Sequence, residues 1–172
     1  TLATLSERID LNVQEVPTGF QALDWRVPKE WNISDAYVKN ERGERVIDFQ
    51  KSNLHVLGYS APISGVVTLN ELRPHLYTKP DMPDAIPYLT SYYEERWGFC
   101  LSQQHLEALP DGRYEILIDS SLKDGHLTFA DAVLPGASQK EILFSTYVCH
   151  PSMCNDNLSG PVLNAFLYQM LA

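Results

Sequence analysis

The stretch from Ile142 to Pro161 constrains the fold of this chain more than any other. An apolar run, ILFSTYVC, leads to His150, and a short polar loop carrying Asp156 then precedes an apolar helical pattern. Because the run has no polar face, it predicts a strand in the middle of a sheet that helices cover on both sides. The order of strand, loop and helix predicts an α/β fold.

The helix expected after this loop carries two apolar stripes, which predict heavy burial. Pro161 suits its first turn, where a missing N–H costs nothing, and Asp156, Asn157 and Ser159 are competent caps. The positive end of the helix dipole therefore points into the loop that carries His150 and Asp156.

Local patterns predict several other elements. Residues 12–16 have the pattern of a short strand, and residues 36–39 and 45–49 flank a Gly-containing loop, as in a β-hairpin. Thr68 and Glu71 form a capping box, which predicts a short helix. The remaining expectations are a strand at 54–59, a helix from Ser102, and strands at 114–119 and 127–134.

The charge balance argues against two classes of partner. The chain has 13 Lys and Arg against 22 Asp and Glu, a net charge of -9, and its basic residues are scattered. This balance argues against nucleic acid and against an anionic membrane surface. No apolar run approaches the roughly 20 residues that span a bilayer, and no basic-then-apolar secretory signal opens the chain. We therefore expect a soluble, cytoplasmic protein.

The three cysteines are expected to be reduced, because they cannot all pair within one chain. Cys149 beside His150 raises the alternative of a thiol protease, but neighbours in a strand point to opposite faces. A structural zinc bound by Cys149, His150, Cys154 and Cys100 is a further alternative, although the usual C-x-x-C knuckles are missing.

His150 and Asp156 are both metal-ligand types, and an imidazole nitrogen with a carboxylate oxygen suits Zn²⁺. They follow a predicted buried strand, where open α/β sheets bind ligands. Two ligands do not define a site, however. Spacing alone leaves open that Asp156 only caps the helix and that His150 is only a hydrogen-bonded residue at a strand end.

His150 followed by DNLSG at 156–160 resembles the His…Asp-Asn-x-Ser-Gly signature of the co-catalytic zinc exopeptidases of the bacterial leucyl aminopeptidase type. Three strings are similar to a bacterial family of aminopeptidase-like proteins with an inserted domain of unknown function: DWRVPKEWNI (24–33), SYYEERWGFC (91–100) and CHPSM (149–153). This resemblance implies a zinc-exopeptidase-like (phosphorylase/hydrolase-like) three-layer α/β sandwich. Residues 1–19 and 96–172 would form its first part, and residues 20–95 a mostly β inserted domain.

The same resemblance implies metal-dependent hydrolysis of an amide bond, most simply removal of N-terminal residues from peptides. His150 would bind one zinc, and Asp156 would bridge two. The general-base Glu and the remaining ligands are expected beyond Ala172, so the chain is expected to be an N-terminal fragment that is inactive alone. Peptides or other amides would be the substrates, and the oligomeric state, a homo-oligomer included, stays open.

Ser152 departs from the wider class, which usually has Asp two residues after the first ligand His. Partners of a metal-bound imidazole help to set its affinity, so a second hypothesis is a non-catalytic binding or scaffold protein with a degenerate metal site. Tyr92 and Trp97 are candidate substrate-binding residues in the aromatic string 88–99. The alternative is that these aromatics form the core of the small domain.

Overall fold

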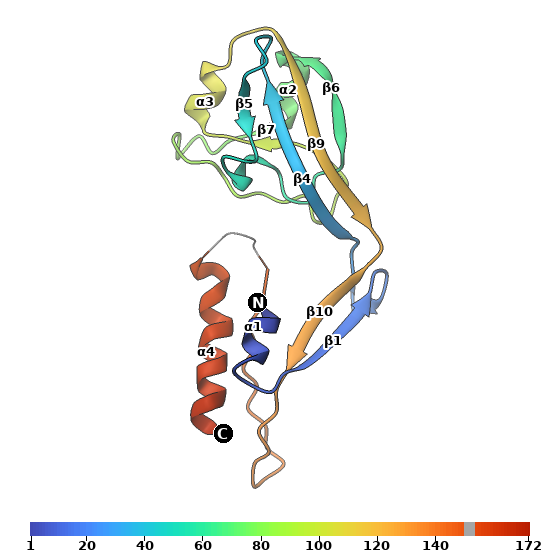
Figure 1. The fold of residues 1–172 in the computed structure, drawn as a ribbon, viewed down its shortest axis with the longest axis vertical. Coiled ribbons are helices and arrows are strands. Elements are labelled where there is room, and N and C mark those ends of the chain that lie inside the picture. The colour runs from blue at the N-terminus through green and yellow to red at the C-terminus, as the bar shows by residue number, and fades with distance from the viewer. Residues whose placement is uncertain (150–153) are drawn as a thin grey trace. The chain divides into compact units, whose positions relative to one another are not determined.

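The computed structural model describes residues 1–149 and 154–172, which form two compact units of mixed α and β structure (Figure 1). Unit 1 contains Thr1–Val27 and His126–Ala172, and unit 2 contains Pro28–Gly125. No helix in the described ranges is long and apolar enough to cross a membrane. Each unit is described by itself.

A four-stranded antiparallel sheet forms the centre of unit 2, in the order β5-β4-β9-β6. Burial alternates along the central strand β9, where Tyr114, Ile116 and Ile118 face the core, because successive side chains of a strand point to opposite faces. β4 and β9 pair along their length, from Glu30 opposite Lys123 onward. The strands are β4 (Glu30–Lys39), β5 (Arg45–Asp48), β6 (Ile63–Thr68) and β9 (Arg113–Lys123).

Two local predictions in unit 2 are confirmed. The β4–β5 hairpin turns at Asn40, whose side-chain oxygen accepts hydrogen bonds of 3.0 Å from the backbone N–H groups of Arg42 and Glu44. The capping box is present at the start of α2 (Leu69–Leu72): Glu71 N–H donates to Thr68 Oγ1 at 3.3 Å, and Thr68 N–H donates to Glu71 Oε2 at 2.8 Å. In both places the side chains satisfy backbone groups that the turn or helix end leaves unpaired.

The core of unit 2 lies between this sheet and the segments that connect its strands. Phe99 and Leu101 are fully buried beside Leu72 of α2 and the core face of β9. Phe99 belongs to β8, which pairs in parallel with β7. The remaining elements of unit 2 are the 3₁₀ turns η1 (Asn53–His55) and η2 (Arg73–His75), β7 (Leu76–Tyr77), β8 (Phe99–Cys100) and α3 (Gln103–Ala108).

Unit 1 contains two antiparallel pairs, the longer β1 with β10 and the short β2 with β3, and two helices. The strand predicted at 12–16 is confirmed as β1. The side-chain amides of Asn12 and Gln14 donate hydrogen bonds to Asp131 Oδ1 across the β1–β10 pair, at 3.3 and 2.7 Å. The side-chain amide of Gln169 donates to the backbone oxygen of Arg8 at 3.0 Å and so ties α4 to the N-terminal segment. The elements are α1 (Leu2–Ser6), β1 (Asn12–Pro17), β2 (Gln21–Ala22), β3 (Trp25–Arg26), β10 (His126–Asp131) and α4 (Asn155–Leu171).

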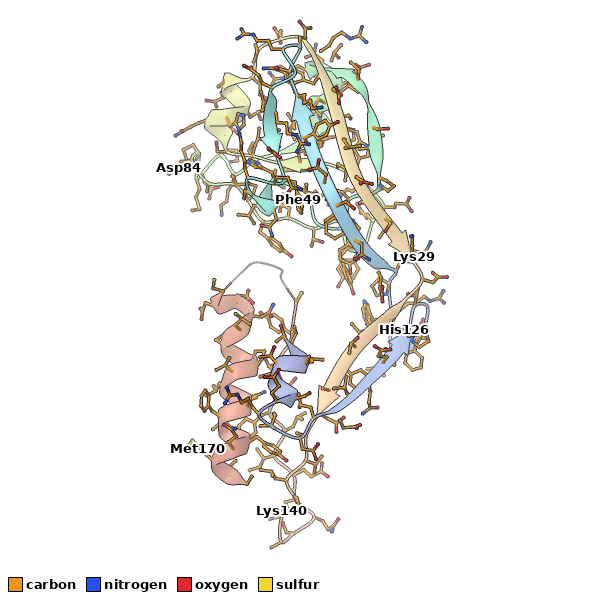
Figure 2. All side chains as sticks on the ribbon, viewed as in Figure 1. Lys29, Phe49, Asp84, His126, Lys140 and Met170 are labelled. Atoms are coloured by element: carbon orange, nitrogen blue, oxygen red, sulfur yellow. The ribbon has the colours of Figure 1, made fainter. Side chains whose placement is uncertain are left out.

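The predicted buried strand at 142–149 is wrong for this chain. No helix or strand lies between Asp131 and Cys149, and Ile142 and Leu143 are 84% and 88% exposed. The heavy burial predicted for α4 is wrong as well, since Met170 is 80% exposed and projects from the helix (Figure 2). An apolar run forms a sheet strand only when other strands pair with it, and none of the described residues pairs with this one.

Two further strand predictions need correction. The predicted strand at 54–59 is a 3₁₀ turn, η1, followed by isolated bridges at Val56 and Gly58. The predicted strand at 127–134 ends at Asp131.

The compact units divide the chain at other positions than the predicted 20 and 95, because β9 is paired on both sides within unit 2. The bounds of the inserted domain as a family unit stay a prediction.

Candidate functional site

Asp156 lies at the start of α4, where the backbone leaves helical geometry. Asp156 and Asn157 have non-helical backbone angles, so the regular turns begin at Leu158 and Pro161 lies in the first of them. The Asp156 side chain is exposed, and its Oδ1 accepts a hydrogen bond of 2.6 Å from the hydroxyl of Tyr147. A carboxylate at this end of a helix is stabilised by the helix dipole.

Tyr147 keeps the proton that it donates to Asp156. Its pKa is raised, first by the hydrogen bond to Asp156, then by partial burial and by the negative charge of Asp156. The phenol therefore keeps its proton at neutral pH. A carboxylate offers about four lone-pair positions, so this bond leaves both oxygens of Asp156 able to accept further partners.

Gly160 allows the segment before the loop to lie directly against α4. A Cβ atom at this position would collide with Thr146 Oγ1 and lie 3.0 Å from Thr146 Cβ. The glycine of the Ser-Gly pair is thus required by close packing. This contact places Tyr147 beside the first turn of the helix and within reach of Asp156.

Asn157 adds a polar group whose partner is not among the described residues. The residue is 8% exposed, and its Nδ2 has no hydrogen-bond partner in the described part of the chain. An amide NH₂ donates hydrogen bonds and does not bind metal ions. This group therefore fits an acceptor, such as a carbonyl or carboxylate, rather than a cation.

The predicted metal ligands lie only partly in the described ranges. His150 and Ser152 are outside them, so of the two predicted ligands the structure describes Asp156 alone. Within 1–149 and 154–172, no three His, Cys, Asp or Glu side chains are grouped to hold a metal ion. A carboxylate is an ordinary zinc ligand, so Asp156 fits as one member of a site whose other ligands lie outside these ranges.

The cysteine alternatives gain no support from the structure. Cys100 is fully buried in unit 2, and burial raises the pKa of its thiol to about 12. Zinc binds the thiolate, which such an environment disfavours. Cys149 and Cys154 are exposed residues of unit 1.

A second candidate site is a recess in unit 2 with a volume of about 190 Å³, which we call the tyrosine recess. Tyr59 stacks on Trp31 with ring centroids 5.8 Å apart, and the edge of Tyr92 meets Tyr59 at 4.9 Å. Tyr93 meets Tyr92 in the same edge-on manner at 5.0 Å. The recess is lined by Pro28, Lys29, Tyr59, Ser91, Tyr92, Tyr93, Glu94, Glu95 and Leu122.

Backbone pairing brings these tyrosines together. The N–H and hydroxyl of Ser91 both donate to the backbone oxygen of Gly58, at 2.8 and 3.1 Å. The N–H of Gly58 donates in turn to the backbone oxygen of Leu89 at 2.9 Å. The residues that follow Gly58 and Ser91 in the chain, Tyr59 and Tyr92, are thereby held side by side.

The structure separates the two predicted substrate-binding residues. Tyr92 lines the tyrosine recess, whereas Trp97 stacks on His75 with ring centroids 3.6 Å apart and packs against the core of unit 2. A role of either residue in substrate binding stays a prediction. Sequence reasoning missed Tyr59 and Lys29, because only the backbone pairing at Gly58 brings Tyr59 to the 91–95 string.

Comparisons with known proteins show what this chain is similar to. Residues 30–121, just over half of the chain, match a family described as "Domain of unknown function (DUF2172)". A Clostridium acetobutylicum protein described as "Putative polysaccharide biosynthesis protein with aminopeptidase-like domain" is 52% identical over all 172 residues. A crystal structure of a "putative peptidase" from Clostridium acetobutylicum matches 99% of the chain with a TM-score of 0.90 and 52% identity. The chain spans 40% of the length of each of these relatives.

Proposed function

Because this chain belongs to the DUF2172 family and is similar to a protein with an aminopeptidase-like domain, we propose that it is part of a metal-dependent amide hydrolase. The activity we propose is that of a zinc aminopeptidase, which removes N-terminal residues from peptides. The crystal structure of a "putative peptidase" that matches almost the whole chain supports a peptidase-like function.

The observation that carries the proposal is the exposed Asp156 carboxylate at the start of α4. It stands in the Asp-Asn-x-Ser-Gly string, and Tyr147 fixes one of its oxygens with a 2.6 Å hydrogen bond. An accessible carboxylate with a fixed orientation is what a bridging metal ligand requires. Gly160 supports this arrangement by admitting Thr146 against the helix.

In the proposed site, His150 and Asp156 are ligands and Tyr147 orients the carboxylate. Bound zinc would supply an acidified water molecule and would polarise the scissile carbonyl. The general base and the remaining ligands are proposed to come from beyond Ala172. We also propose the three-layer sandwich for the whole protein. The exposed apolar side chains of 142–148 and α4 support this, because burial there would remove them from water.

Zinc analysis of the full-length protein tests the proposal. We expect about two zinc ions per chain after purification or after incubation with Zn²⁺ at neutral pH. A protein that takes up no zinc under either condition would overturn the proposal. The alternative motivated by Ser152, a non-catalytic binding or scaffold protein, would then stand.

Tyr147→Phe is expected to weaken zinc binding by the full-length protein about tenfold, because partners that orient a ligand usually contribute 10–100-fold to metal affinity. The substitution removes only the hydroxyl that donates to Asp156. Competition with a zinc-binding dye measures the change. Tyr168→Phe on α4 is the matched control, and equal affinity of the two variants would contradict the role of Tyr147.

A further inference from the structure

We propose that the tyrosine recess of unit 2 binds a single sugar ring of a carbohydrate. This goes beyond the proposed hydrolase, because none of the residues that line the recess takes part in the proposed metal site. The inference rests on the aromatic faces, the balance of charge and the size of the recess.

The recess offers aromatic surface to a ligand. Tyr93 is 85% exposed, and its ring meets Tyr92 edge-on. A pyranose ring carries a patch of C–H groups on its face, and such groups pack against the electron-rich face of an aromatic ring. An exposed tyrosine ring is therefore a suitable platform for the apolar face of a sugar.

The polar groups around the recess favour a neutral ligand. Lys29 donates hydrogen bonds, whereas the carboxylates of Glu94 and Glu95 accept them. Arg96 Nη1 lies 3.8 Å from Glu94 Oε2, so the charge of Arg96 partly offsets that of one lining carboxylate. Sugar hydroxyls both donate and accept, which suits this mixed set. An organic cation would suit the rings and carboxylates but would be opposed by Lys29 and Arg96.

The recess is small and open to solvent, so it holds about one ring, and any further rings of a carbohydrate would lie outside it. A volume of about 190 Å³ corresponds to about six water molecules and lies below the ~300 Å³ at which pockets for drug-sized molecules begin. One wall is also fixed in advance: Tyr59 stacks on Trp31, whose indole N–H donates to the backbone oxygen of Ser60 at 2.9 Å. Such a site loses little conformational freedom on binding.

Ligand-observed saturation-transfer NMR on the full-length protein tests the proposal. The probes are the methyl glycosides of glucose, galactose and N-acetylglucosamine, with tetramethylammonium as the cationic probe. We expect saturable binding of at least one glycoside, and we expect Tyr93→Ala to weaken it about fivefold, as the loss of one aromatic contact would. Phe20→Ala, which removes a half-exposed aromatic ring of unit 1, is the matched control and should bind as the wild type does.

Two results would overturn the proposal. One is the absence of saturable binding for all three glycosides. The other is binding of tetramethylammonium that Tyr93→Ala abolishes, which would assign the recess to organic cations. Zinc content is measured on the same samples. Both variants keep Asp156 and Tyr147, so a failure of sugar binding is distinguished from a failure of the metal site.

Discussion

Asp156→Asn in the full-length protein is expected to lower kcat/KM for an aminoacyl p-nitroanilide about a thousandfold, equivalent to about 4 kcal/mol of transition-state stabilisation. Asparagine keeps the shape of the side chain and its hydrogen bond from Tyr147, but it removes the negative charge that would bind two cations. The zinc content of the variant should fall in parallel.

Asp124→Asn provides the matched control, because Asp124 is an exposed carboxylate in the turn between β9 and β10. It should retain the activity and the zinc content of the wild type. Circular dichroism of both variants checks that the fold is intact. If Asp156→Asn kept wild-type activity with wild-type zinc content, Asp156 would not be a metal ligand.

Phe99→Ala is expected to lower the free energy of unfolding of unit 2 by about 3–5 kcal/mol, as deletion of a buried aromatic ring usually does. Phe99 is fully buried in β8, in the core cluster that also contains Leu101 and Ile116. The cost combines the lost transfer free energy of the ring with the cavity that remains. Urea unfolding followed by tryptophan fluorescence measures it.

Tyr93→Ala is the control for this measurement, because Tyr93 belongs to the same aromatic string but is 85% exposed. Its effect on the free energy of unfolding should stay within about 0.5 kcal/mol. A cost below about 1 kcal/mol for Phe99→Ala would contradict the placement of this ring in the core.

Local sequence signals predicted local structure in unit 2. The capping box of Thr68 and Glu71 and the Asn40 turn each join groups only a few residues apart, so the pattern contains both partners. The prediction of a strand at 54–59 was wrong, because Val56 and Gly58 form only single bridges, with residues more than 30 positions away. Apolar pattern alone does not distinguish a buried loop from a strand.

The two candidate sites could be predicted from the sequence to different extents. Asp156 was found from a contiguous string, and the structure adds Tyr147 and Gly160 as the residues that orient and pack its surroundings. The tyrosine recess was found only in part, because Tyr59 and Tyr92 meet through backbone bonds of Gly58 and Ser91. The strand predicted at 142–149 depended on partners that the described residues do not supply.

The pairing of Glu30 with Lys123 brings both ends of unit 2 to opposite positions on neighbouring strands. A module whose two ends meet can be cut out of one protein and placed in a surface loop of another, because the host chain needs to open by only a short distance. Segment 28–125 thus has the geometry of a domain that can be inserted into a loop of another protein. Gene rearrangement could gain or lose it without rebuilding the strands on either side.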